Sequence, residues 1–587
     1  NPDDFLWKGR VLNHLQKPDD ATKAFFRAVQ LDPNLPQAWL TLIEHLVRNG
    51  RSRDAENFAR QAENHLATDS APLVLAQAYA LLGNHSLAEQ YYQTAQAAAP
   101  EDPILGRSVA AYYLATDQRP QAERELKKIL QLTDSSQPSR SSHAVWARRM
   151  LAQVLAKDGG YLRFRTALAL LDTNRVAGEL GEMDQRIKAE LLGARVEPDF
   201  RQEALRILER LQDGAKPLSL QQRMLLARLY DQSGRWNKAR NLMIDLVSET
   251  PENADLLVNL SEMLLNRQEV DLSGRWTDKL AQIEPNSYRT LRLRARVLSA
   301  RRENEEAMKL IDAWLPKPLK PSDANRVLQA ATLLEELKYL RTAEQNFTTF
   351  DKLSSGQSLA LVGFLARQGH LDQAFPLAAN RVNDENLRDV ARLAIFAITQ
   401  HPLRVTDAHF GQARKWYEQA LAKSSNDLSL KLNWSSVLAV LGRSEEAESI
   451  LKKALDADLT AQQKGIVVNN LAYLRAVRGA TDADSLRLVD TAAKLIGPHP
   501  SVLDSLAMIH LSKGHCSRAI EQLEEATRFG VDSGLYYFHL ALAHQCASDR
   551  SSAQQALKEA ERLGFSRQQL GVGEQKRYQQ LESWLAL

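Results

Sequence analysis

The feature that most constrains this chain is a self-similar pattern with a period of about 34 residues. Alanines recur at matching places: Ala28 and Ala62 are 34 residues apart, and Ala62 and Ala95 are 33 apart. Near the C-terminus, Ala519 and Ala553 are again 34 apart. A period of this size predicts a tandem array of one supersecondary unit, in which each copy packs only on its neighbours. An array also explains how a chain of 587 residues can fold without one large core.

Each period reads as two amphipathic helices joined by a tight turn. In the first helix, large residues such as Trp39, Leu42 and Leu46 fall at i, i+3 and i+7, on one face. A glycine such as Gly50 follows, where a tight turn needs a permissive backbone. The second helix carries small and aromatic residues at i, i+4 and i+7, which let the helices approach closely. In the first period these residues are Ala21, Phe25 and Ala28.

This pattern resembles the tetratricopeptide repeat family, in which a bulky-Leu-Gly/Ala-Tyr helix is followed by an Ala-aromatic-Ala helix and a proline. A near-ideal unit runs through Trp434, Gly442 and Ala454. The resemblance covers nearly the whole chain, in about sixteen units. It implies an all-α fold, an α-solenoid wound as a right-handed superhelix with a concave groove, whose family members usually bind peptides or protein surfaces.

The regularity of the repeat changes along the chain, and we use it to divide the array. At the C-terminal end, Tyr578, Leu581 and Trp584 predict an amphipathic capping helix that covers the last apolar face, although a partner-binding tail is the alternative. The expected segments are regular units at 1–136, degenerate helical repeats at 137–219, repeat units at 220–321, divergent units at 322–427, regular units at 428–573 and the capping helix at 574–587.

Composition and motifs argue against several classes of function. The net charge is only +3, from 75 basic and 72 acidic residues, which gives no broad attraction to nucleic acid or to a membrane surface. No apolar run approaches the ~18 residues of a membrane-spanning helix. The sequence has no phosphate-binding loop, dinucleotide fingerprint or hydrolase motif. We therefore expect no cofactor and no enzyme activity, and a protein or peptide partner instead.

A basic cluster is the first candidate binding site. Arg289, Arg292 and Arg296 are spaced i, i+3 and i+7 and share a helical face. The family resemblance implies that this face lines the concave groove, where guanidinium groups suit carboxylates or phosphates. One interpretation is an anchor for an acidic or phosphorylated partner. The alternative is a solvated stripe paired with nearby acids, such as Glu303, Glu305 and Glu306.

Three further residues occupy expected groove positions. Asn469 could hydrogen-bond the backbone of a bound peptide, and Tyr473 and Phe538 could receive its apolar side chains. The alternatives are helix capping or interhelical bonding for Asn469 and ordinary helix packing for the two aromatic residues.

A cluster of histidines and cysteines lies near the C-terminus. His510 and His544 hold the same place in successive repeats, and Cys516 and Cys546 are the only cysteines. Imidazole and thiolate are ligands for zinc or copper. The favoured interpretation is that each histidine replaces a half-buried tyrosine, beside two ordinary free thiols and with no metal. Two cysteines cannot form a disulfide framework and fit a reducing compartment.

The leading functional hypothesis is a non-enzymatic scaffold or adaptor for other proteins. Because the chain begins at Asn1 without a methionine, we expect it to be a fragment. It could then be the regulatory or substrate-recruiting arm of a larger multidomain enzyme. It could also be a periplasmic scaffold of a bacterial export or polysaccharide machine, if an upstream signal is missing; otherwise we favour the cytoplasm.

Overall fold

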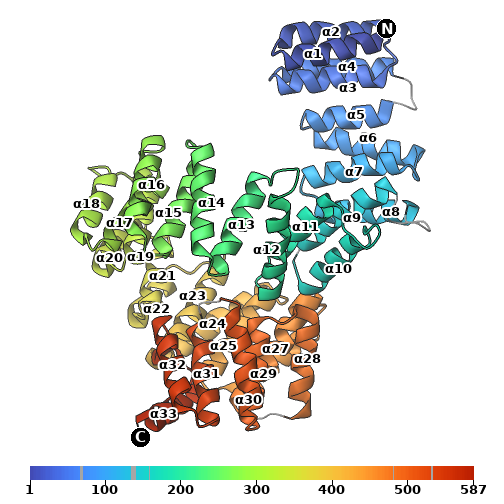
Figure 1. Ribbon diagram of the computed structural model, residues 1–587. Coiled ribbons are helices and arrows are strands. Elements are labelled where there is room, and N and C mark those ends of the chain that lie inside the picture. Colours follow the sequence, from blue (N-terminus) through green and yellow to red (C-terminus); the bar gives the residue numbers. More distant parts are fainter. Residues whose placement is uncertain (67–70, 134–140, 158, 480–481, 531–532, 587) are drawn as a thin grey trace. The chain divides into compact units, whose positions relative to one another are not determined.

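The fold is all-α, as predicted. The computed structural model describes residues 1–66, 71–133, 141–157, 159–479, 482–530 and 533–586 (Figure 1). Within these ranges the chain forms 33 α-helices and three short 3-10 turns, and its only extended pairing is an isolated bridge between Val176 and Glu179. In the described chain, helices α1 to α8 and α13 to α32 pair into fourteen hairpins, α9 to α12 lie between these groups in sequence, and α33 follows the last hairpin, which confirms an α-solenoid.

The helices divide between two compact units, which we describe separately. The first unit comprises residues 1–159 and 163–191. Its helices are α1 (Pro2–His14), α2 (Pro18–Leu31), α3 (Pro36–Arg48), α4 (Ser52–His65), α5 (Ala71–Leu81), α6 (His85–Ala98), α7 (Pro103–Ala115), α8 (Arg119–Thr133), α9 (Ser142–Lys157) and most of α10 (Tyr161–Asp172) and α11 (Glu182–Gly193).

The second unit comprises residues 160–162 and 192–587, and it carries the candidate sites. Its helices are α12 (Pro198–Gln212), α13 (Leu220–Gln232), α14 (Trp236–Glu249), α15 (Ala254–Asn266), α16 (Val270–Ile283), α17 (Tyr288–Ala300), α18 (Asn304–Trp314), α19 (Ala324–Glu336), α20 (Leu340–Leu353), α21 (Ala360–Arg367), α22 (Leu371–Ala379), α23 (Leu387–Gln400), α24 (Asp407–Lys423), α25 (Leu428–Val440), α26 (Ser444–Ala454), α27 (Ala461–Val477), α28 (Ala483–Ile496), α29 (Pro500–Ser512), α30 (Cys516–Arg528), α31 (Gly534–Cys546), α32 (Arg550–Arg562) and α33 (Val572–Ala586). The 3-10 turns are η1 (Pro321–Asp323), η2 (Pro402–Arg404) and η3 (Arg567–Gln569).

The turn within most hairpins uses a residue in the left-handed backbone region, whereas the turns between α11 and α12 and between α23 and α24 have none among their described residues. Gly50 and Gly442 have φ values of +73° and +78° there, as expected for glycine. Gln268 and Arg302 adopt the same conformation at the corresponding turns, with φ values of +61° and +64°. The backbone therefore repeats even where the glycine signal is missing from the sequence.

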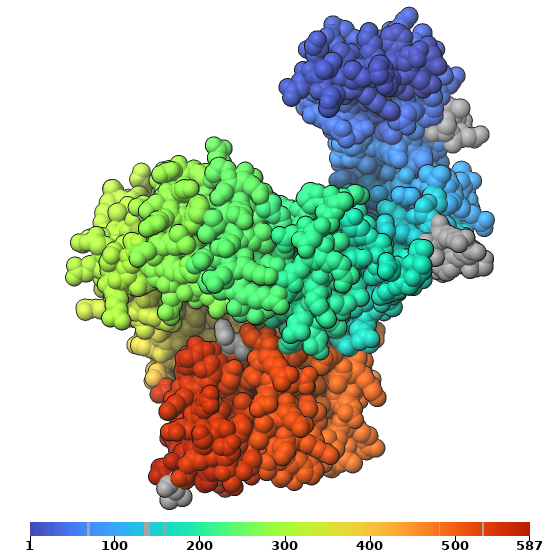
Figure 2. Space-filling view, viewed as in Figure 1, coloured from blue at the N-terminus to red at the C-terminus, as the bar shows by residue number. Residues whose placement is uncertain are grey.

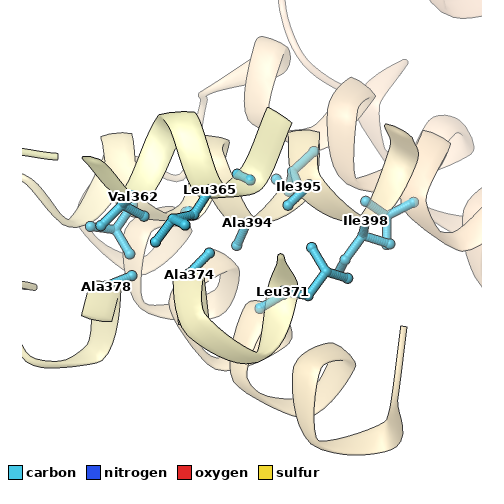
Figure 3. Packing of buried hydrophobic residues seen from close by; sticks show 14 of the residues in the cluster. Val362, Leu365, Leu371, Ala374, Ala378, Ala394, Ile395 and Ile398 are labelled. Atoms are coloured by element: carbon cyan, nitrogen blue, oxygen red, sulfur yellow. The ribbon is translucent and has the colours of Figure 1, made fainter. Parts of the chain in front are cut away.

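Small residues bring the helices together in the core. Figure 3 shows Leu365 of α21 facing Ala374 of α22 and Ala394 of α23, and all three are at most 5% exposed. Alanine on the second helix leaves room for the larger side chain opposite, so the three helices pack without a gap. Within each unit, first helices of successive hairpins also pack more closely on one another than second helices do, so the first helices form the inner layer of that unit.

The predicted capping helix is α33, which begins at Val572, two residues before the predicted start. Its Leu581 is fully buried and Tyr578 is 8% exposed, in one cluster with Phe538 of α31. Figure 2 shows the orange and red C-terminal hairpins as one continuous packed surface. The division of the array into six segments stays a prediction.

We predict that Leu365→Ala destabilises the α21–α23 core by about 2–5 kcal/mol, because a buried leucine leaves a cavity that its neighbours cannot fill. The measurement is native-state hydrogen exchange of the amides in these three helices. Arg341→Ala, at an exposed position on α20, is the matched control and should change stability by less than about 0.5 kcal/mol. Equal exchange in the two variants would contradict this account of the core.

Candidate functional site

The predicted arginine face lies on α17, and its members bridge three successive first helices. Arg292 donates to Glu262 of α15 and to Glu336 of α19, each at 2.8 Å. Arg296 lies 3.6 Å from Glu262 and 3.5 Å from Glu336, between the same two acids. The two guanidinium groups and two carboxylates form a charge-balanced ladder along the inner side of the array.

Arg289 continues this ladder. It forms an ion pair with Asp255 of α15 at 2.5 Å and a bidentate pair with Glu284, which lies before α17. The hydrogen bonds that Arg289 donates to these two carboxylates, Glu284 first and then Asp255, raise its pKa above the ordinary value. One alternative from the sequence, that the arginines pair with acidic side chains, therefore agrees with the structure, but the acids expected as partners are not the ones found. The partners are on neighbouring repeats, and they replace Glu303, Glu305 and Glu306 of the following turn.

The three other predicted groove residues lie close to the C-terminal hairpins. Asn469 is 5% exposed and its Oδ1 has no hydrogen-bond partner among the described residues, whereas the neighbouring Asn470 is only half-buried. Phe538 is fully buried and stacks on Phe565, with ring centroids 5.0 Å apart. Tyr473 donates its hydroxyl proton to the α33 carboxylate of Glu574 at 2.8 Å. In this conformation Tyr473 and Phe538 are therefore covered by the C-terminal end of the chain.

Beside these residues lies a groove of about 560 Å³. One wall is formed by α25 and α27, and the opposite wall by the start of α31 and the segment before α33. Hydroxyl, amide and aliphatic groups dominate the lining, and its one acidic side chain is Glu574. Lining residues on α25 and α27 include Ser435, Ser436, Ala439, Val440, Asn470 and Leu474.

The side-chain amide of Asn470 lies in the groove lining. Within the described part of the chain it has no hydrogen-bond partner, although it lines the groove. An amide offers two donors and one acceptor oxygen, which matches the alternating groups of an extended backbone. Of the two neighbouring asparagines, Asn470 is therefore the one placed to meet a ligand, and the sequence alone could not distinguish their faces.

A buried charge network lies behind the groove and was missed by the sequence analysis. His539 of α31 is fully buried, with Nδ1 2.6 Å from Asp504 of α29 and Nε2 3.1 Å from Glu574 of α33. Burial alone would lower the pKa of His539, but the two carboxylates raise it to about 9. The imidazole is therefore protonated at neutral pH and donates from both nitrogens.

The same network determines the protonation of Glu574 and of Tyr473. Burial alone would raise the pKa of Glu574, but hydrogen bonds from His539 and Tyr473 hold it below the ordinary value. Burial and the charge on Glu574 raise the pKa of Tyr473 well above 10.0. Tyr473 therefore keeps its proton and serves as a hydrogen-bond donor to an ionised carboxylate.

The two cysteines form a disulfide, contrary to the expectation of two free thiols. Cys516, the first residue of α30, and Cys546, the last residue of α31, are joined in a disulfide with their Cα atoms 5.5 Å apart. The prediction of two free thiols is therefore wrong, and neither sulfur is a thiolate ligand. His510 and His544 are half-buried, and no group of three or more potential metal ligands exists in the part of the chain that the structure describes.

Comparison with known proteins identifies the repeat. A family model described as tetratricopeptide repeat matches residues 40–103 and 224–288. Over 86 residues, 15% of this chain, the sequence is 33% identical to "Cellulose synthase operon protein C" of Pseudomonas fluorescens (strain SBW25). That match spans only 7% of the relative's length.

Two solved structures resemble the chain with a TM-score of 0.37 each. One is the crystal structure of the APC/C hetero-tetramer Cut9–Hcn1, at 13% identity over 95% of this chain and 96% of that one. The other is the pentatricopeptide repeat protein PPR10 from maize, at 15% identity over 100% of this chain and 88% of that one. Both TM-scores are low, so the assignment of the repeat rests on the matched family model and on the hairpins themselves. None of the described helices has the length and apolar character needed to cross a membrane.

We predict that the double substitution Cys516→Ser/Cys546→Ser destabilises the hairpins α29–α32 by about 3–4 kcal/mol, because the disulfide closes a loop of 30 residues in the unfolded chain. The measurement is the urea midpoint of the C-terminal hairpins with and without dithiothreitol. The reductant should lower the midpoint of the parent and leave that of the double variant unchanged. A parent that does not respond to the reductant would contradict a stabilising disulfide.

We predict that His539→Gln weakens docking of α33 at pH 7 by about 3–5 kcal/mol, because it leaves two buried carboxylates without their cation. The pKa of His539 is raised on folding, so its contribution is fully present below about pH 6.5 and is lost as the pH rises through about 9. Hydrogen exchange of the α33 amides, corrected for the intrinsic rate, should therefore show protection falling from pH 7 to pH 10 in the parent. The His539→Gln variant should lack this step, and an identical pH profile in both proteins would contradict the assignment.

Proposed function

We propose that this chain, in which residues 40–103 and 224–288 match the tetratricopeptide repeat, is a non-enzymatic scaffold that binds a segment of a partner protein on the inner face of its second unit. Within the second unit, first helices present an inner surface that carries Arg292 on α17 and Asn470 on α27. Such a surface suits binding of another protein better than chemistry, because its polar groups are spread along it and do not converge on one point.

The observation that carries the proposal is the groove between α25, α27 and the segment before α33. Its volume of about 560 Å³ is large enough for several residues of a peptide. Its one acidic group, Glu574, is already engaged by His539 and Tyr473, so the free lining is uncharged. The unpartnered amide of Asn470 supports main-chain recognition of an extended segment.

The arginine face on α17 is the second proposed contact. Arg289, Arg292 and Arg296 remain between about one fifth and two fifths exposed despite their ion pairs. A partner carboxylate could replace Glu262 or Glu336 on these guanidinium groups, because the displaced carboxylate is about one third exposed and water can solvate it. We therefore propose that an acidic stretch of the same partner reaches this face.

A second candidate is a scaffold that works in an oxidising compartment, such as the periplasm. The disulfide between Cys516 and Cys546 favours it, because such bonds persist mainly outside reducing compartments. The short match to a cellulose synthase operon protein supports it loosely. This candidate shares the binding groove with the first and differs only in where the partner resides.

The scaffold proposal predicts that a partner recovered from the native lysate by affinity purification is lost when the groove is filled. Ser436→Trp puts an indole on an exposed position of α25 in the groove, and we expect at least tenfold less partner with it. Ser551→Trp, at an exposed position on α32 outside the lining, should recover as much partner as the parent. The triple variant Arg289→Glu/Arg292→Glu/Arg296→Glu tests the second contact in the same experiment.

The outcomes separate the two contacts. Loss with Ser436→Trp alone places the partner in the groove and excludes the arginine face, and loss with the triple variant alone does the reverse. If both variants and the control recover the partner equally, the proposed inner-face site is wrong. Recovery of no partner by the parent would contradict the scaffold function itself.

A further inference from the structure

The segment from Ser566 to Arg577, here called the C-terminal arm, runs along the inner side of its own solenoid. At Gly571 the backbone passes so close to α25 that an added Cβ would lie 2.8 Å from the Cα of Val440. Val572 follows next to Gly442, at the end of the same helix. The arm thus occupies the kind of surface on which a partner segment would bind.

Two charged side chains attach the arm to α27 and its neighbours. Arg577 donates to the carbonyl oxygens of Ala476 and Val477, at 3.4 and 2.8 Å. These carbonyls belong to the last turn of α27, where a helix has free acceptors and favours a cation. Glu574, three residues earlier, receives hydrogen bonds from Tyr473 and His539.

The receptor for Glu574 is complete without the arm. Tyr473 belongs to α27, His539 to α31 and Asp504, which holds the imidazole from its other side, to α29. With the arm removed, the His539 and Asp504 charges balance, and the phenol and imidazolium still point donors at the place of the Glu574 carboxylate. This arrangement is a preformed carboxylate-binding site that the chain fills with its own side chain.

Outside these contacts the arm is held at Leu570, which is 2% exposed, and at the buried Gly571. Val572 is 62% exposed, and Gly573 and Lys576 are also exposed. Its link to α32 contains Gly564, with a φ of +81°, and the arm contains Gly571 and Gly573. Glycines leave the backbone free to adopt other paths, so movement of the arm is opposed mainly by the buried Leu570 and Gly571 and by the contacts of its two charged side chains.

We propose that the C-terminal arm is an internal ligand that a partner displaces. The part of the partner segment that takes the place of Glu574 to Arg577 is helical, and it carries an acidic residue followed three positions later by an arginine, as the arm does. Its carboxylate binds Tyr473 and His539, and its guanidinium binds the end of α27. This inference rests on the scaffold function proposed above and names the chemistry of the partner.

The test uses the full chain and a fluorescent peptide that copies residues 566–586. In the parent the tethered arm competes at a high effective concentration, so the peptide should bind weakly. Glu574→Gln removes the charge of the tethered arm, and the variant chain should bind the peptide at least tenfold more tightly than the parent. A peptide with glutamine at the same position should lose at least tenfold in affinity for the variant chain. Glu525→Gln, at an exposed position on α30, is the control chain and should match the parent.

Hydrogen exchange of α33 in the same chains shows whether the arm is released. Faster exchange in Glu574→Gln, with an unchanged circular dichroism spectrum, together with the expected peptide affinities supports the proposal. Unchanged exchange means that the carboxylate does not hold the arm, and it overturns the proposal. Faster exchange without tighter peptide binding overturns it as well. Partner recovery that still depends on Ser436 would then show that the scaffold function survives while the internal ligand fails.

Discussion

The structure depends on one constraint: each hairpin has an apolar face that only the next hairpin can cover. Ala374 and Ala394 show how the constraint is met, because small side chains let neighbouring helices approach until leucines such as Leu365 fill the space between them. Stability is then a sum of contacts between neighbours, and the last hairpin would leave its face in water. Helix α33 covers that face with Tyr578 and Leu581, so the end of the array is set by the same requirement as its interior.

Because packing uses the residues between helices, the side chains on the inner side of the array are available for binding. The positions that point inward are filled by groups that suit exposure or pairing. On α17 these are arginines that pair with acids of the neighbouring repeats, and on α25 and α27 they are serines and asparagine beside a groove. A change of inward-facing residues along the chain therefore gives one fold several kinds of surface without any change in its core.

The sequence predicted the hairpins, the cap and the arginine face, because these follow from periodicity within one repeat. It missed several charged partners because they lie about one repeat length away in the sequence, and not within the same repeat. Arg289 and Asp255 are 34 residues apart, and His539 lies 35 residues from both Asp504 and Glu574. A search for opposite charges one period away would have found these pairs, but not Glu262 and Glu336, which lie 30 and 44 residues from Arg292. Contacts such as that between Tyr473 and Glu574, 101 residues apart, depend on how three repeats stack and cannot be read from spacing alone.

The charge network at the end of the array is more than a cap requires. Replacing buried ion pairs by apolar side chains of similar size is often neutral or stabilising, so Tyr578 and Leu581 alone could hold α33 in place. The additional carboxylate of Glu574 must be desolvated, and it stays buried only because His539 and Tyr473 satisfy it. What such an arrangement adds is specificity: an arm without the carboxylate leaves the Tyr473 hydroxyl and the His539 Nε2 proton without an acceptor, whereas a segment with a carboxylate at that place satisfies both. A site that discriminates by charge and is filled by its own chain is suited to exchange one ligand for another.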